Sequence, residues 1–197
     1  MIAMKTRAVL WCACKLLGWN DMTNSMRTLF PMALLAALMA ATRIHHFPVP
    51  DASLAVFLMA GFLVRNRLFF GALLIEAGLL DYFAISHMGV SDYCFTPAYW
   101  FLIPTYAVLW YAGRSARAHR EKPWLMAAIS LAAVSLAFLV SNLSFYLFSG
   151  GYGDMSIGIY ALRVAPYYLP YVESAAVYLV PAFILQFARG AVSTRHA

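Results

Sequence analysis

Long apolar stretches recur along this 197-residue chain, and they limit its possible folds more than any other feature. The clearest is Trp124–Phe148, which holds no charged side chain. A helix needs about 20 apolar residues to cross the hydrocarbon core of a bilayer, and this stretch is long enough. Because 63% of all residues are hydrophobic and 11% are charged, a water-soluble core cannot enclose this much apolar surface. The sequence therefore predicts an all-α integral membrane protein.

The apolar stretches predict six transmembrane helices that form one membrane domain over residues 28–189, with tails at 1–27 and 190–197. The six spans are Thr28–Arg43, Asp51–Val64, Leu68–Ile85, Pro97–Tyr111, Trp124–Phe148 and Pro170–Phe187. Pro166 and Pro170 divide the last apolar stretch, so Ile157–Leu169 is expected to be a short surface helix or a re-entrant segment. The first tail contains a short apolar run but no cleavage pattern, and we interpret it as cytoplasmic or interfacial.

The distribution of basic residues predicts how the helices are oriented. With six spans, the two tails share one side of the membrane with the second and fourth loops, and this side holds every Lys and Arg except Arg43 and Arg163. Cytoplasmic segments carry such an excess, so both termini are expected in the cytoplasm. The net charge of +6 then reflects orientation in the bilayer, and it gives no reason to expect nucleic-acid binding.

A polar stretch at residues 81–106 interrupts this apolar pattern on the predicted outer face. It carries Asp81, Asp92, Tyr93, Cys94 and Tyr99. Acids within or at the edge of membrane spans are costly and usually functional, which favours Asp81 and, inside the same span, Glu76. Part of the tyrosine content fits an ordinary aromatic belt at the membrane surface. The cluster as a whole suits a large, polar ligand that is captured from outside.

Cys94 is the most reactive residue type in this stretch. Cys12 and Cys14 lie far away near the start of the chain, so we expect Cys94 to be a free thiol. A lone cysteine is often only a small buried hydrophobic residue. As a thiolate it is a strong nucleophile and a soft ligand for a metal with an open axial position. The chain contains no glycine-rich phosphate loop ending in Gly-Lys, so no bound nucleotide is expected.

Three segments resemble a known family. They are TRIHHFPVPDASLAVFLMAGF from Thr42, EAGLLDYFAI from Glu76 and GVSDYCFTPAYWFLIPTYAVLW from Gly89. They look like the corresponding segments of the BtuM-type cobalamin transporters, which are solitary substrate-binding S components of the energy-coupling-factor class. The resemblance covers most of the chain from Thr28 onward, and SDYCFTPAY is its most specific part.

The resemblance implies a six-helix S-component-like bundle that takes up cobalamin (vitamin B12) through a site on the extracytoplasmic side. It implies that Cys94 is the axial ligand of the cobalt, and that Asp81 and Tyr99 hold the ligand or orient the thiol. A shared energy-coupling-factor module is a further partner that it implies, beside cobalamin and the lipid bilayer. From topology alone we add five more candidate ligand contacts: Tyr93, Asp92, His45, Arg43 and Arg163.

A thiolate that binds cobalt from below is expected to weaken the bond to the upper ligand, such as cyanide. Removal of that ligand by Cys94 is therefore a hypothesis for a chemical step attached to transport. Three alternatives remain open. They are an S component for another vitamin, a membrane-bound thiol enzyme with Cys94 as its nucleophile, and a structural membrane subunit whose polar outer face contacts a partner protein.

Overall fold

The computed structural model describes residues 19–44, 49–64 and 66–194, and this part of the chain is helical without any β-strand. Its α-helices are α2 (Trp19–Ile44), α3 (Ser53–Leu63), α4 (Arg67–Met88), α5 (Leu102–Ala118), α6 (Pro123–Phe148), α7 (Ile157–Val164) and α8 (Tyr168–Thr194). Three short 3-10 helices join them: η1 (Asp92–Cys94), η2 (Pro97–Phe101) and η3 (Ala165–Tyr167). The predicted all-helical character is thus confirmed.

Three helical stretches in the described part are long and apolar enough to cross a membrane. They are Arg67–Met88, Pro123–Phe148 and Ile157–Phe187. Thr28–Arg43 and Ser53–Leu63 are apolar but shorter. The last stretch is divided near the two prolines, as the sequence predicted, because the 3-10 helix η3 separates the short helix α7 from the long helix α8. Pro166 lies in η3 and Pro170 in the first turn of α8, where a missing N–H costs no helical hydrogen bond.

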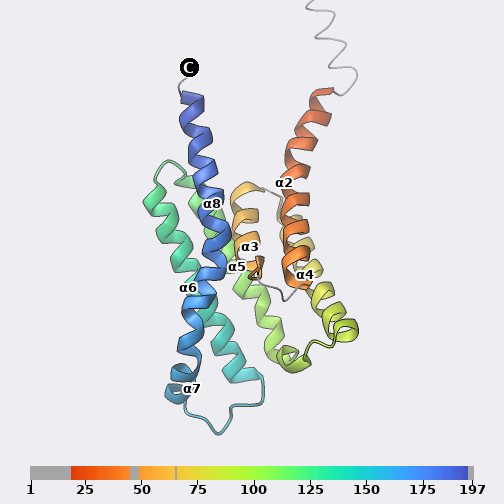
Figure 1. Cartoon of the computed structure of the whole chain (residues 1–197), viewed down its shortest axis with the longest axis vertical. Helices are drawn as coiled ribbons and strands as arrows, with labels where there is room; N and C mark the ends of the chain where they lie inside the picture. Colours follow the sequence, from red (N-terminus) through yellow and green to blue (C-terminus); the bar gives the residue numbers. More distant parts are fainter. Residues whose placement is uncertain (1–18, 45–48, 65, 195–197) are drawn as a thin grey trace, which may run out of the picture.

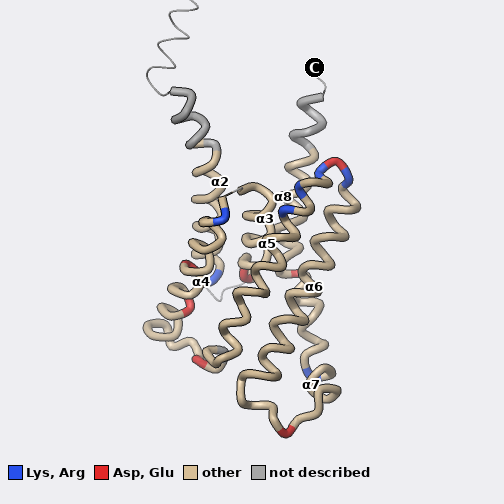
Figure 2. Tube along the Cα trace, turned by 180° about the vertical axis from the view of Figure 1, so that it is seen from behind, with Lys and Arg blue, Asp and Glu red and all other residues tan. Residues whose placement is uncertain are grey.

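The helices form a bundle in which α3 is the central element (Figure 1). It packs against α2, α4, α5 and α8, and most of its residues are buried. The start of α2 and the end of α8 lie at the same end of the molecule, and α7 lies at the opposite end (Figure 1). Figure 2 shows basic residues gathered at the α5–α6 turn, at the end of the molecule where α2 begins and α8 ends.

The contact between α3 and α5 requires glycine on both helices. A Cβ atom at Gly61 would lie 2.0 Å from the carbonyl oxygen of Trp110, and one at Gly113 would lie 2.0 Å from the carbonyl oxygen of Leu58. Two helices can approach this closely only where neither carries a side chain at the contact. Next to it, the Phe57 and Tyr106 rings stack with their centroids 4.0 Å apart. This packing fixes the hydroxyl of Tyr106 in the site described below.

Helix α3 is shorter than the predicted span, with 11 residues. At 1.5 Å per residue it extends about 16 Å, which is roughly half the hydrocarbon thickness of a bilayer. Its first residue, Ser53, is buried. Because α3 begins at Ser53, no helix in the described part of the chain occupies the centre of the bundle on the N-terminal side of this residue. The polar site lies there, next to Ser53.

Candidate functional site

Arg43, in the last turn of α2, is the hub of the polar cluster. Its Nε donates to Oδ1 of Asp81 at 2.6 Å and its Nη2 donates to Oδ2 at 2.7 Å. This is a bidentate ion pair, which is the strongest geometry available to arginine and a carboxylate. Only 11% of the Arg43 side chain and 21% of the Asp81 side chain are exposed. The pair therefore joins α2 to α4 in a poorly solvated place.

The remaining nitrogen of the guanidinium group contacts two further helices. Nη1 of Arg43 donates to the hydroxyl of Ser53 at 2.8 Å and to the hydroxyl of Tyr106 at 3.0 Å. Asp51 is a weaker partner, with a nitrogen–oxygen distance of 3.5 Å and 47% of its side chain exposed. Arg43 thus connects four helices: α2, on which it lies, α3 at its first residue, α4 and α5. Each nitrogen of its guanidinium group has an acceptor.

Local hydrogen bonds position the start of α3 against this hub. Oδ1 of Asp51 accepts from the backbone N–H of Ser53 at 3.0 Å and from its hydroxyl at 2.7 Å. An aspartate that bonds the backbone two residues ahead forms an Asx turn, which is typical of a helix start. The hydroxyl of Thr42 accepts from the N–H of Ala52 at 3.1 Å, so the chain before α3 is also held to α2.

Tyr99, in the 3-10 helix η2, is the last member of the polar cluster. Its hydroxyl donates to Oδ2 of Asp81 at 2.8 Å, which gives that carboxylate oxygen a second donor beside Arg43. The backbone reaches this point through η2, whose first turn is capped by Thr96 and opened by Pro97. Asp81 therefore accepts hydrogen bonds from two different segments, both distant in sequence. We name Arg43, Asp81 and Tyr99 the polar partition, because they lie between two cavities.

The first cavity has a volume of about 440 Å³ and lies between the α2–α3 connection, α4 and the segment after α4. It is lined by Thr42, Arg43, Val49, Pro50, Asp51, Asp81, Ala84, Ile85, Val90, Ser91, Phe95 and Tyr99. Its walls combine carboxylates and hydroxyls with apolar surface, which is the usual composition of a small-molecule site.

The second cavity has a volume of about 390 Å³ and lies between η2 and the C-terminal part of α6. It is lined by Arg43, Asp81, Tyr93, Ala98, Tyr99, Phe101, Leu102, Ser141, Asn142, Ser144 and Phe145. The polar partition belongs to both cavities, so one side of each partition residue faces each space. A ligand larger than either cavity would have to contact the partition.

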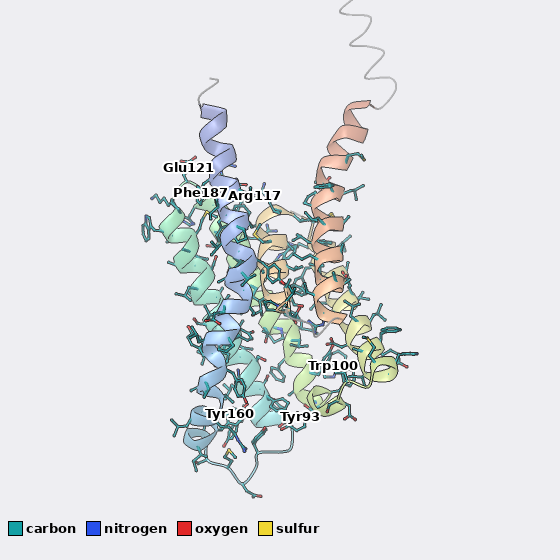
Figure 3. All side chains as sticks on the ribbon, in the orientation of Figure 1. Tyr93, Trp100, Arg117, Glu121, Tyr160 and Phe187 are labelled. Atoms are coloured by element: carbon teal, nitrogen blue, oxygen red, sulfur yellow. The ribbon has the colours of Figure 1, made fainter. Side chains whose placement is uncertain are left out.

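Aromatic residues close the end of the molecule beside the second cavity, where Figure 3 labels Tyr93 and Tyr160. The hydroxyls of Tyr93 and Tyr152 lie 2.7 Å apart and share a hydrogen bond. The Tyr93 ring also packs against Phe145, and the Tyr152 ring packs against the buried Tyr160. These contacts connect the segment around η1 to the α6–α7 connection, so the backbone on both sides of Cys94 is held close to the two cavities.

The structure brings four of the predicted site residues together: Arg43, Asp81 and Tyr99 in the partition, and Tyr93 in the wall of the second cavity. Asp92 is exposed at the start of η1, and Arg163 is exposed on α7 and lines neither cavity.

His45 lies outside the described residues. The backbone of Cys94 ends η1, between the cavity residues Ser91 and Phe95, and its side chain lies outside the described part of the structure.

Sequence reasoning missed Ser53 and Tyr106 as partners of Arg43. A signal existed for each. Ser53 lies two residues after Asp51, the spacing of an Asx turn. Tyr106 lies seven residues after Tyr99, which places both on one face of a helix. Within the described residues no three His, Cys, Asp or Glu side chains gather into a metal-binding group.

Comparison with known proteins adds no assignment, because no family model matches the chain and no curated protein is significantly similar to it.

Proposed function

We propose that this protein takes up cobalamin across the bacterial cytoplasmic membrane and binds it on the extracytoplasmic side, with the Cys94 thiolate as axial ligand of the cobalt. The proposal starts from the resemblance of SDYCFTPAY and its neighbouring segments to BtuM-type S components. In this proposal the chain has six spans with both ends in the cytoplasm. The start of α2, the end of α8 and the basic α5–α6 turn lie at the same end of the molecule, which supports that orientation.

One observation carries the proposal. Asp81 and Tyr99, which the resemblance assigns to the ligand site, are 18 residues apart and are joined by a hydrogen bond of 2.8 Å between the two cavities. The residues on both sides of Cys94, Ser91 and Phe95, line the first of these cavities. The backbone of Cys94 is therefore at the border of the space that its proposed ligand would fill.

The groups around the cavities match the chemistry of a corrinoid. Cobalamin has a broad, flat ring with amide side chains on its edge, and each amide both donates and accepts hydrogen bonds. Asp81, Ser141 and Asn142 supply acceptors, and Arg43 supplies donors. Phe95 and Tyr93 supply aromatic faces on which a flat ring can pack. The cobalt brings its equatorial ligands with it, so it needs only one ligand from the protein.

The size of cobalamin gives the polar partition a role in binding. Either cavity alone has the volume of a site for a small ligand, within the usual range of about 300–1,000 Å³. Cobalamin is larger, and it would occupy both cavities at once. Tyr99 is the partition residue that can move at lowest cost, because Asp81 retains both hydrogen bonds from Arg43 when the tyrosine leaves.

A thiolate from Cys94 would replace the nucleotide base on the lower face of cobalt and donate electron density to the metal. The bond to an upper cyanide is then weakened, and cyanide leaves with the bonding electron pair while cobalt keeps its oxidation state. Water takes the open position. This step would convert cyanocobalamin into a thiolate-ligated form as it is bound, and it requires no oxidant or reductant.

The test is an absorption spectrum of the full-length protein, purified in detergent after growth with cyanocobalamin. The wild type is expected to be coloured, with a spectrum shifted from that of free cyanocobalamin. Cys94→Ala is expected to lose the shift, whereas a Cys12→Ala/Cys14→Ala protein keeps it. A wild type that stays colourless after soaking in cyanocobalamin would refute the proposal. A thermal-shift screen of other vitamins then identifies a different S-component ligand if there is one.

A further inference from the structure

Glu173 is an ionisable residue in the second turn of α8, near the centre of the apolar stretch Ile157–Phe187, and its side chain is exposed. Acids inside membrane-spanning helices normally face the bundle interior, where they find a partner. Glu173 faces away from it. Among the described residues it forms no hydrogen bond and no ion pair, and it lines neither cavity of the proposed ligand site.

The depth of Glu173 follows from the contacts between α6 and α8. The hydroxyls of Ser135 and Tyr168 lie 2.7 Å apart, and the rings of Phe138 and Tyr171 lie 5.3 Å apart. Ser135 and Phe138 occupy the middle of α6, a 26-residue helix that is long and apolar enough to cross a membrane. Glu173 is two residues beyond Tyr171 along α8, and so it lies level with the middle of α6. About 15–20 Å of apolar helix separates this level from either end of α6.

The surface around Glu173 has the form of a helix-docking face. Leu169, Glu173, Val177, Val180 and Ile184 follow one another at intervals of three and four residues, and all five are exposed. Residues at this spacing lie in one line along a helix. We name this line the Glu173 stripe.

A shallow groove of about 140 Å³ runs beside the stripe, between α6 and α8. Small residues such as Ser130, Ala175 and Ala176 line it, together with Val180 of the stripe. Small residues allow another helix to approach closely within a membrane. The side chains of the stripe form a ridge, and the groove lies next to it. One transmembrane helix could therefore pack against both.

The charge decides what kind of helix fits. A carboxylate half-way through a bilayer is stabilised by a cation at the same depth. A second copy of this chain does not supply one, because the described basic side chains other than Arg43 lie at helix ends, in turns or on α7. Arg43 is already committed to Asp81.

We propose that the Glu173 stripe is the docking face for a membrane-spanning helix of a partner protein that carries an arginine or lysine half-way through the bilayer. The basic side chain pairs with Glu173, and the apolar residues of the helix pack on Val177, Val180 and the groove beside them. This interface is separate from the cavities around Arg43 and does not depend on the identity of their ligand.

The experiment uses the full chain in phospholipid nanodiscs and synthetic oligoleucine helices with one central guest residue, and it measures association by fluorescence energy transfer. The helix with a central arginine is expected to bind the wild type about tenfold more tightly than the helix with a central leucine, which corresponds to one good interhelical polar contact. Glu173→Gln is expected to remove that preference. Glu76→Gln is the matched control, because Glu76 is an acid inside α4 that is only half-exposed, and it is expected to keep the preference.

Three results would overturn the proposal. The arginine helix binds no better than the leucine helix, the Glu173→Gln protein keeps the preference, or a helix with central glutamine binds as well as the arginine helix. Self-association of the wild type that depends on Glu173, measured without any peptide, would assign the stripe to a second copy instead. The cobalamin spectrum of Glu173→Gln separates the two proposals, since a corrinoid shift equal to that of the wild type is expected whatever the helix assay gives.

Discussion

Replacement of Asp81 by asparagine tests whether the Arg43–Asp81 pair holds the bundle together. The substitution keeps the size and shape of the side chain and removes its charge. In the native protein Arg43 and Tyr99 both donate to Oδ2 of Asp81, at 2.7 and 2.8 Å. An asparagine must place its NH₂ group either toward Nε of Arg43 or toward Nη2 of Arg43 and the Tyr99 hydroxyl. The tyrosine hydroxyl can rotate and accept from that group, whereas the guanidinium group cannot.

The expected loss of stability follows from burial and from the partners that remain. Removing one partner of a buried ion pair costs about 3–5 kcal/mol. Arg43 keeps its hydrogen bonds to Ser53 and Tyr106, and the introduced asparagine keeps one acceptor oxygen, so we expect Asp81→Asn to lower the free energy of unfolding by about 2–3 kcal/mol. For a chain of this length that corresponds to a fall in Tm of about 5–10 °C.

Asp51→Asn is the matched control, because Asp51 also faces Arg43. That pair is 3.5 Å long and the aspartate side chain is 47% exposed, so its charge is largely screened by solvent. Exposed pairs contribute about 0.2–1 kcal/mol. The oxygen of asparagine still accepts from the N–H of Ser53, which preserves the start of α3. We expect a fall in Tm of about 3 °C or less.

Thermal unfolding in detergent, without added ligand, measures both variants. An Arg43→Gln protein and the Arg43→Gln/Asp81→Asn double variant complete a thermodynamic cycle, and the coupling energy is expected to exceed about 1 kcal/mol because the two residues are in direct contact. Equal Tm values for Asp81→Asn and the wild type would refute this reasoning. So would equal losses in Asp81→Asn and Asp51→Asn, which would mean that the bidentate geometry contributes nothing beyond proximity.

Two other substitutions test the packing of α3. Gly113→Ala brings a methyl group into the carbonyl oxygen of Leu58, so we expect a loss of about 1–3 kcal/mol or more, whereas Gly71→Ala, which meets nothing within 4 Å, is expected to leave Tm unchanged or to raise it. Arg117 donates to the carbonyl oxygen of Phe62 at 3.2 Å near the end of α3, and Arg117→Gln is expected to cost about 1 kcal/mol. Arg114→Gln, an exposed change on the same helix, is its control, and equal Tm values for the two would contradict the capping role.

Much of the candidate site was visible in the sequence because its residues violate the surrounding pattern. Asp81 is an acid at the end of an apolar stretch, and Tyr99 belongs to the segment with the most specific resemblance. Arg43 was proposed because it is one of two basic residues on the predicted outer face. Asp81 and Arg43 could be inferred from the sequence with the membrane as solvent, whereas Tyr99 also needed the resemblance.

The partners of these residues were not visible, because pairing between helices depends on how the helices are placed. Arg43 reaches Asp81 over 38 residues and Tyr106 over 63. Nothing in the spacing of apolar residues states which helix faces which, since every helix in a bilayer is apolar over most of its surface. The exposure of Glu173 was unpredictable for the same reason, because an acid in an apolar helix is expected to face inward.

Helical character and a preference for the bilayer follow from the amino-acid sequence alone, since every backbone group in hydrocarbon must be bonded within its own helix. The length of α3 and the position of the polar partition depend on the tertiary structure. Gly61 and Gly113 allow α3 and α5 to touch backbone to backbone, and this contact places Tyr106 beside the guanidinium group of Arg43. Close packing between helices that are distant in sequence thus decides which polar groups meet. The local sequence around each residue does not specify which of these helices will be in contact.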